Sequence, residues 1–391
     1  MNKSHNLTFA YLLNASVWIY FLGNIGGWVI PEIVFNLMGE RSLSESAAGG
    51  IVALELLGVA LGSLALSLSV DRIPLRLIGT LTAAILVISQ YISQDITTPA
   101  TLLAVRFVCG FAQGVLMGIA NAVLASGPNP HSRLAVANIA NVALGSLLLY
   151  ALAPLQTLWD GIGLFEALTL VCLVLAPLCL RIKPRLVSTE QAIPQKLGLP
   201  NASSYWLVIA MAVFAAGSGA AFTFSFLMGS NAGLADSSIN TTISIAVLGA
   251  IPGSLLCGLL GNRFRVFWPF TIGLAIHALA SVAAANSTGL WSFALGVAGI
   301  LFGAYFFLPY LQGLSTRYDP LGGTSAAIGG AFFLTMAAGA YIGGTLIEFA
   351  GLASLGWAVV IGNLISGLLI MVAVAVYREP EEAYHLAFAK D

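Results

Sequence analysis

Charge is what this sequence most lacks, because Asp, Glu, Lys and Arg together make up only 8% of its 391 residues. Ordinary soluble domains contain roughly 25% of these residues. A soluble fold of this size needs a charged surface to stay dispersed, so lipid must be the solvent for much of the surface. With 59% hydrophobic residues and a net charge of −1, the sequence predicts an all-α membrane protein and gives no reason to expect a nucleic-acid partner.

Cysteine and catalytic motifs are also scarce. The four cysteines, Cys109, Cys172, Cys179 and Cys257, fall inside apolar segments and show no paired ligand spacing, which argues against a disulfide framework and a metal site. We find no Walker-type phosphate loop, no H-E-x-x-H and no G-x-S-x-G. Few long polar loops exist to hold a catalytic or signalling domain. We therefore expect no enzyme, no cofactor and no metal.

Long apolar runs are abundant instead. A helix needs about 20 apolar residues to cross a hydrocarbon core of ~30 Å. Since the runs lack apolar/polar alternation, helices are favoured over strands, and the first run is too long for a signal peptide. The sequence predicts twelve spans, near 9–37, 46–70, 75–93, 99–124, 133–157, 161–181, 204–229, 237–260, 266–285, 289–312, 324–349 and 352–377.

The distribution of Lys and Arg predicts the orientation of these spans. If the N-terminus is cytoplasmic, thirteen of the 15 basic residues fall on the inner side, with Arg41 outside and Arg106 inside a span. We therefore expect both termini to be cytoplasmic. The short linker and the lack of targeting extensions favour a bacterial inner membrane. The basic stretch 182–203 contains three prolines and is predicted to be a cytoplasmic linker. It would join six-helix bundles at 1–181 and 204–377, with a tail at 378–391.

An internal repeat relates the two halves. The second span reads LG at 57–58, GSL at 62–64 and DR at 71–72. The eighth span reads LG at 248–249, GSL at 253–255 and NR at 262–263, at a constant offset of 191 residues. Parallel repeats of six spans are typical of transporters in which two bundles rock around a central site.

The same stretches resemble the major facilitator superfamily, whose loop after the second span reads G-x-x-x-D-R-x-G-R-R. Here SLSVDRIPLR at 67–76 keeps the Asp-Arg pair and the last Arg, and GLLGNRFR at 258–265 is a second, weaker copy. The resemblance implies two bundles related by a pseudo-two-fold axis and a transporter that functions as a monomer. It also implies a cytoplasmic gate formed by Asp71, Arg72, Arg76, Asn262 and Arg263.

The fourth span strengthens this resemblance. RFVCGFAQGVLMG at 106–118 places an Arg before glycines at every fourth position, which is similar to the family's fourth-span motif. Such glycines form a flat helix face that allows close packing. GAYIGG at 339–344 is similar to the G-P-x-x-G-G element of drug antiporters but lacks its Pro and lies in the second half, which argues against a drug:proton antiporter.

Ionisable residues inside the spans are candidates for function, because each costs about 2.5–3.5 kcal/mol to insert at a helix centre. Arg106 and Glu55 lie at similar depths, and Glu32 lies nearer the outer end of its span. All three are expected to meet in the first bundle, where protonation of Glu55 or Glu32 would weaken its hold on Arg106. The alternative is a permanent structural ion pair.

The other ionisable residues are expected to matter less. Glu166 and Glu348 lie near outer helix ends, where water can solvate them. His277 is the only intramembrane His; an imidazole suits proton transfer, but the family places the ninth span at the periphery, which favours a packing role.

By the same resemblance, the first, fourth, seventh and tenth spans line a central cavity. Its expected polar and aromatic contacts are Asn14, Trp18, Tyr20, Asn24, Trp28, Gln113, Asn121, Ser218, Phe222, Phe224, Tyr305, Tyr310 and Gln312. These residues would suit a small organic solute with apolar and hydrogen-bonding parts. The sequence thus predicts a proton-coupled secondary transporter, with small-molecule solute, protons and lipid as partners. An uncoupled facilitator, a membrane enzyme and a sensor remain as alternatives.

Overall fold

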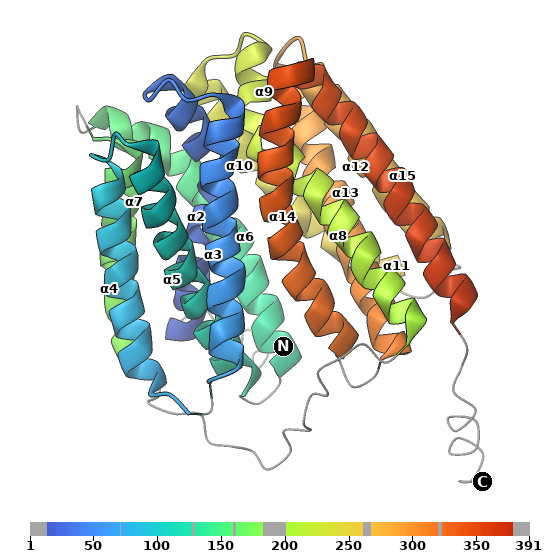
Figure 1. The fold of residues 1–391 in the computed structure, drawn as a ribbon, viewed down its shortest axis with the longest axis horizontal. Helices are drawn as coiled ribbons and strands as arrows, with labels where there is room; N and C mark the ends of the chain where they lie inside the picture. The colour runs from blue at the N-terminus through green and yellow to red at the C-terminus, as the bar shows by residue number, and fades with distance from the viewer. Residues whose placement is uncertain are drawn as a thin grey trace, which may run out of the picture.

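A computed structural model describes residues 14–70, 72–126, 130–158, 162–182, 201–260, 267–319 and 323–377. These residues are helical almost throughout (Figure 1). Within them, twelve spans are long and apolar enough to cross a membrane, so the predicted all-α, twelve-span fold is confirmed. The start of the first predicted span, the linker after residue 182 and the tail 378–391 lie outside the described residues.

The helices follow one another with short connections. The first half contains α2 (Ala15–Gly39), α3 (Glu45–Ser67), α4 (Leu75–Ser93), α5 (Pro99–Ala125), α6 (Pro130–Leu158), α7 (Leu164–Leu175) and the short 3-10 helix η1 (Ala176–Arg181). The second half contains α8 (Ala202–Thr223), α9 (Ser225–Asn231), α10 (Asp236–Val247), α11 (Ala250–Leu260), α12 (Phe267–Ala285), α13 (Leu290–Tyr318), α14 (Gly323–Ala350) and α15 (Leu352–Val376).

The seventh and eighth spans are each interrupted, although the sequence predicts them to be continuous. The seventh breaks at Phe224 into α8 and α9, and the eighth breaks at Leu248 and Gly249 into α10 and α11. Pro252 explains the second break, because it has no N–H to donate to the carbonyl of Leu248. Ile251 N donates to that carbonyl instead, at 3.0 Å.

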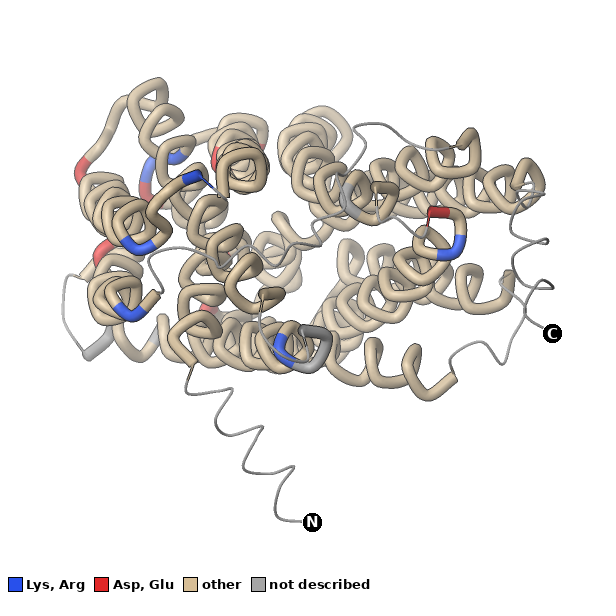
Figure 2. Tube along the Cα trace, turned by 90° about the horizontal axis from the view of Figure 1, so that it is seen from below, with Lys and Arg blue, Asp and Glu red and all other residues tan. Residues whose placement is uncertain are grey.

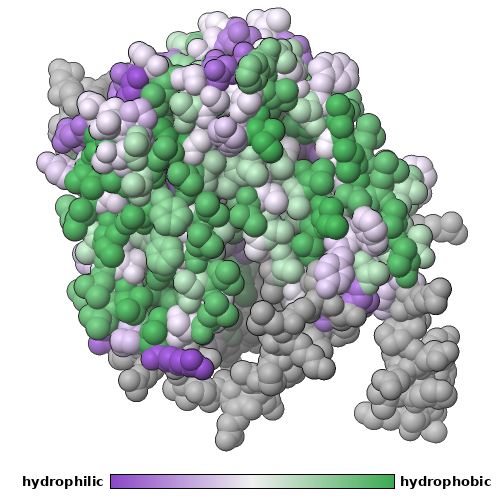
Figure 3. Space-filling view, in the orientation of Figure 1, coloured by the Kyte–Doolittle hydropathy of each residue, from purple (hydrophilic) through white to green (hydrophobic). Residues whose placement is uncertain are grey.

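The helices form two bundles, which lie side by side when the molecule is viewed from below (Figure 2). We call the end where α2 begins and α15 ends the proximal end, and the opposite end the distal end. Apolar side chains cover the middle of the flank, and more polar residues gather toward its upper end (Figure 3). This belt is the surface expected of a protein whose flank faces lipid.

The repeat seen in the sequence corresponds to equivalent helix contacts in the two bundles. A Cβ added at Gly58 or Gly62 of α3 would overlap the carbonyl oxygen of Phe107 or Phe111 of α5. A Cβ at Gly253 of α11 would lie 2.6 Å from the carbonyl oxygen of Phe302 of α13. Phe111 and Phe302 are themselves separated by the 191-residue offset. Both copies therefore use glycine to pack the second span of a bundle tightly against its fourth.

The two bundles touch near the distal end. A Cβ at Gly49 of α3 would lie 2.5 Å from the carbonyl oxygen of Ala340 of α14, and one at Gly344 would overlap the carbonyl of Glu45. The rings of Phe35 in α2 and Phe226 in α9 pack with centroids 4.4 Å apart and planes tilted by 33°. These contacts join the distal ends of the bundles.

Candidate functional site

A cavity of about 330 Å³ lies between the bundles on the proximal side of these contacts. Small-molecule sites commonly enclose about 300–1,000 Å³. Helices α2, α3 and α6 form one wall, and helices α8, α13 and α14 form the other. The described lining residues are Tyr20, Asn24, Gly27, Trp28, Leu56, Asn138 and Asn141 on the first wall, and Met211, Ser218, Phe222, Ile300, Leu301, Ala304, Tyr305, Leu308, Gln312, Ile328, Gly329, Phe332, Phe333 and Met336 on the second.

Paired aromatic and asparagine side chains make the first wall polar. The Tyr20 hydroxyl donates to Asn138 Oδ1 at 3.0 Å, and Trp28 Nε1 donates to Asn141 Oδ1 at 3.1 Å. Trp28 lies against Gly145, where a Cβ would come within 2.5 Å of the indole. These bonds fix the two rings against α6 and leave the remaining amide group of each asparagine without a partner among the described residues.

The second wall is mostly apolar. Phe222, Phe332 and Phe333 present aromatic rings, and aliphatic and methionine side chains fill the spaces between them. Tyr305 and Gln312 are the polar exceptions on α13, and their side chains make no hydrogen bond within the described part of the chain. The cavity is therefore amphipathic, with hydrogen-bonding groups mainly on the first bundle and rings mainly on the second.

An ion pair lies inside the first bundle, away from this cavity. Arg106 Nε donates to Glu55 Oε2 at 3.0 Å, and Arg106 Nη2 donates to Glu55 Oε1 at 2.6 Å. Arg106 is fully buried and Glu55 is 2% exposed. This two-bond geometry is the strongest that Arg and a carboxylate can form, and it brings together two of the three residues expected to meet.

Neighbouring side chains complete the hydrogen bonding of this pair. Arg106 Nη1 donates to Gln90 Oε1 at 2.8 Å, and Gln113 Nε2 donates to Glu55 Oε1 at 2.7 Å. Gln113 Oε1 in turn accepts from Gly26 N at 3.0 Å. The Arg106 guanidinium also lies 4.9 Å from the centre of the Phe165 ring. Both oxygens of the Glu55 carboxylate are thus matched by donors from α5.

The fourth-span glycines allow the ion pair to form. A Cβ at Gly110 would overlap the backbone of Glu55, and one at Gly114 would overlap the carbonyl of Val59. Helix α5 therefore approaches α3 closely enough for Arg106 to reach the carboxylate. This is the close packing that the glycine spacing predicts.

Glu32 does not join Arg106. Its carboxyl group faces the second bundle, where it lies next to the side chain of Asn240 on α10 and near the like charge of Asp236. Glu32 is 6% exposed and Asn240 is 4% exposed. Glu32 Oε2 and Asn240 Oδ1 are both buried without a hydrogen-bond partner. Two neighbouring residues from different bundles thus each bury one acceptor that has no hydrogen-bond partner among the described residues.

Two prolines loosen helices next to the cavity. Pro31 lies inside α2 beside Glu32, and Pro309 lies inside α13. Each proline removes one helical hydrogen bond. The carbonyl of Tyr305, freed by Pro309, accepts from the Ser254 hydroxyl at 3.3 Å. Both helices can bend at these positions with little loss of internal bonding.

Only some of the residues expected in the cavity line it, and the others lie elsewhere in the structure. Tyr20, Asn24, Trp28, Ser218, Phe222, Tyr305 and Gln312 line the cavity. Asn14 caps α2 by accepting from Ser16 N, Gln113 is in the ion-pair cluster, and Phe224 is fully buried. Trp18 and Asn121 are half-buried outside the lining, and Tyr310 packs against Phe270 and Phe306. Asn138 and Asn141 were not expected.

The remaining candidates are placed as follows. Asp71, Asn262 and Arg263 lie outside the described residues. Arg72 is exposed, and Arg76 Nε donates to the carbonyl of Ile182 at 2.8 Å.

The buried His277 meets Asn363 of α15, with 3.0 Å between His277 Nδ1 and Asn363 Nδ2. Glu166 accepts from Gly163 N at the start of α7, and Glu348 is exposed. The described residues contain no cluster of three or more potential metal ligands.

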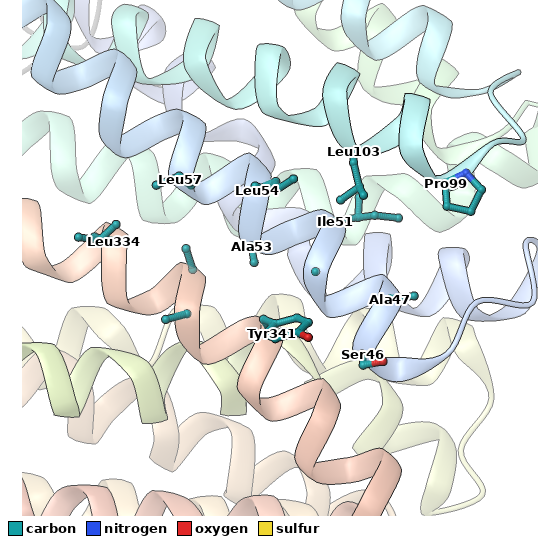
Figure 4. Close-up of a pocket in the computed structure, with 13 residues that line it drawn as sticks. Ser46, Ala47, Ile51, Ala53, Leu54, Leu57, Pro99, Leu103, Leu334 and Tyr341 are labelled. Carbon is teal, nitrogen blue, oxygen red and sulfur yellow. The ribbon is translucent and has the colours of Figure 1, made fainter.

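A second hollow lies on the flank between α3, α5 and α14 (Figure 4). Its lining includes Leu54, Leu57, Leu103 and Leu334, with Tyr341 across from α3. This groove is almost wholly apolar and opens toward the lipid-facing surface, so it differs in chemistry from the cavity between the bundles.

Comparison with known proteins agrees with this arrangement. The family model described as Major Facilitator Superfamily matches residues 7–320. No curated protein sequence matches.

Solved structures of similar fold cover nearly the whole chain. A mutant of the nucleoside transporter NupG is 14% identical, covers 94% of this chain and 100% of its own, and has a TM-score of 0.75. A bacterial homologue of the human lysosomal transporter Spinster, in an inward-facing and occupied conformation, is 18% identical. It covers 94% of this chain and 97% of its own, with a TM-score of 0.76. A D-xylose–proton symporter is 14% identical, covers 95% of this chain and 97% of its own, and has a TM-score of 0.71. At these identities the likeness shows the fold alone.

Proposed function

Since the chain belongs to the Major Facilitator Superfamily and is therefore a transporter, we propose that it carries a small organic solute by alternating access and couples this movement to protons bound at Glu32. The observation that carries the proposal is the contact between Glu32 and Asn240, where Glu32 Oε2 and Asn240 Oδ1 are both buried without a hydrogen-bond partner. The solute occupies the cavity between the bundles, and the proton occupies the contact just distal to it.

Protonation of Glu32 favours the conformation described here. A carboxylate buried without a cation is costly, because the interaction it makes does not replace its lost hydration. The neighbouring Asp236 increases this cost. A protonated Glu32 can accept from the Asn240 amide and donate to Asn240 Oδ1, which satisfies both groups. Ionised Glu32 instead favours separation of α2 from α10, which admits water to the carboxylate.

Glu55 is a weaker candidate for the proton site. Both of its oxygens already accept from Arg106, and Oε1 also accepts from Gln113. Protonation would leave Arg106 buried beside a neutral acid, and a buried ion pair that loses one charge is strongly destabilised. The geometry therefore supports the alternative of a permanent structural pair that holds α3, α4 and α5 together.

Glu32 is also connected to the cavity along its own helix. Trp28 lies four residues before Glu32, so the two side chains project from the same face of α2 one turn apart. Trp28 lines the cavity. Movement of α2 at Pro31 during transport would change the environment of the solute and of Glu32 together.

We assign the proximal end to the cytoplasm of a bacterium, following the excess of Lys and Arg at that end in the sequence. The linker 182–203 and the tail 378–391 are then cytoplasmic, with bundles at 1–181 and 204–377. Asp71, Arg72, Arg76, Asn262 and Arg263 would form the gate at this end, opposite the glycine contacts of α3 and α14. The protein would function as a monomer.

The test is solute-evoked proton movement in proteoliposomes that contain a pH-sensitive dye. A panel of neutral and charged metabolites is added outside, with liposomes lacking protein as the control. We expect at least one solute to change the internal pH, and a pH gradient to drive accumulation of that solute. Accumulation that never exceeds equilibration would identify an uncoupled facilitator and overturn the coupling.

A further inference from the structure

We propose that the solute is an uncharged amphiphile: a flat ring system joined to a compact part rich in hydroxyl or amide groups. This inference rests on the proposed function, because it assumes that the cavity between the bundles carries the solute. It follows from the distribution of charge, hydrogen-bonding groups and aromatic rings around that cavity.

The absence of charge from the described lining excludes an ionic solute. None of the lining residues of the described chain is acidic, basic or His. Two buried charged residues expected near the cavity are committed elsewhere: Arg106 is fully buried against Glu55, and Glu32 faces Asn240. A charged solute would lose hydration on entry and would meet no opposite charge, which is a large cost in a partly dehydrated site.

Unused hydrogen-bonding groups define the polar side of the solute. Asn138 and Asn141 each use one oxygen to hold an aromatic ring and keep an amide donor group free. The side chains of Tyr305 and Gln312 reach the same cavity from α13 and are also without partners among the described residues. These groups offer both donors and acceptors, which matches hydroxyl and amide groups better than purely apolar or purely accepting ones.

Aromatic rings define the other side. Phe222 comes from α8, and Phe332 and Phe333 come from α14, with the latter two at a centroid distance of 5.3 Å in an edge-to-face arrangement. Rings arranged in this way stabilise a flat partner by stacking and by burial of its apolar surface. The solute therefore bridges the bundles, with its polar part on α2 and α6 and its ring on α8 and α14.

The volume of the cavity suits a single such unit. About 330 Å³ is near the lower end of the range of ~300–1,000 Å³ for small-molecule sites. A ring joined to one sugar-sized polar group is of this order.

Matched compounds test the inference by thermal stabilisation of the purified full-length protein. One set is phenyl β-glucoside, phenyl β-glucuronide and methyl β-glucoside; the other is adenosine, adenosine monophosphate and ribose. We expect a neutral ring-bearing member of at least one set to stabilise the protein, and its charged and ringless counterparts to bind at least about tenfold more weakly. Equal or stronger binding of a charged or ringless member, or no binding of either neutral ring-bearing compound, would overturn the proposal.

Variants locate the binding in the cavity. Asn138→Leu and Phe332→Ala are each expected to weaken binding of the neutral compound by about tenfold, through loss of a hydrogen bond and of a stacking ring. Tyr341→Phe, in the lipid-facing groove, is the control and should bind like the parent. Equal loss in the control, or no loss in either cavity variant, would contradict the assignment.

The two proposals fail separately. If neutral compounds bind as expected but no proton moves with them, the coupling at Glu32 fails and the assignment of the solute class stands. If a charged solute binds and is accumulated by a pH gradient, the coupling stands and the assignment of the solute class fails.

Discussion

Glu32→Gln is expected to abolish proton-driven accumulation of the solute while leaving downhill exchange between preloaded liposomes and medium. The amide is neutral and nearly isosteric with the protonated acid, so it can pair with Asn240 at every pH. The carrier then binds no exchangeable proton at this site. We expect the accumulation ratio to fall to one, and the rate of accumulation to drop at least about tenfold, which corresponds to ~1.4 kcal/mol. Radiolabelled uptake with and without a pH gradient measures both quantities.

Two further variants serve as a control and as a test of the rival proton site. Glu348→Gln removes an exposed carboxylate from the end of α14 and should accumulate solute like the parent. Glu55→Gln removes the other buried carboxylate of the first bundle; if that protein folds, we expect its residual uptake to remain pH-dependent. Coupled accumulation by Glu32→Gln, together with pH-independent uptake by Glu55→Gln, would move the proton site to Glu55.

Arg106→Leu is expected to destabilise the protein by about 3–5 kcal/mol, since it leaves the Glu55 carboxylate buried without its cation. Gln90 Oε1 loses its donor at the same time. The loss should appear as poor yield from the membrane and as a lower midpoint of thermal unfolding in detergent. Arg72→Leu, at an exposed position, is the matched control and should leave the midpoint nearly unchanged.

The double variant Glu55→Leu/Arg106→Leu shows whether Arg106→Leu loses stability because it leaves a buried charge unpaired or because it removes a large side chain. Removing both partners leaves no buried charge, and apolar replacement of a buried pair is often close to neutral. We expect the double variant to recover most of the stability that Arg106→Leu loses. A double variant that is destabilised as much as the two single variants together would show that the pair contributes little beyond packing.

Much of the fold was predictable because a membrane span needs a long apolar run whatever its neighbours are. The third predicted span, 75–93, matches α4 at both ends. The breaks at Phe224 and Gly249 escaped prediction, since hydropathy continues through them. Pro252 was the available signal for the second break, because a proline in the first turn of a helix is compatible with a new start.

The candidate site was less predictable, because depth in the membrane does not fix the direction in which a side chain points. Glu55 and Arg106 were correctly expected to be close, helped by the glycines that bring α5 against α3. Glu32 has a suitable depth too, but its position around α2 directs it to α10 of the other bundle. A single sequence contains little information about that rotation.

The unknown rotation of each helix also explains why some cavity residues were wrongly predicted and others were missed. Gln113 lies on a span expected to line the cavity, yet it faces the interior of its bundle and binds Glu55. Asn138 and Asn141 lie on the fifth span, which was not expected to contribute. Their spacing of three residues, with Gly145 four further on, places all three on one helical face. That polar face in an apolar span was the signal that could have identified them.

The most direct test of the coupling measures the distance between the distal ends of the bundles as pH changes. Spin labels at Glu40→Cys and Thr288→Cys, two exposed distal positions, report this distance by pulsed electron resonance; the four native cysteines are buried. We predict a short distance at low pH, a growing long-distance population as pH rises, and the short distance at every pH in Glu32→Gln. An unchanged pH response in Glu32→Gln would contradict the claim that a proton on Glu32 holds the bundles together.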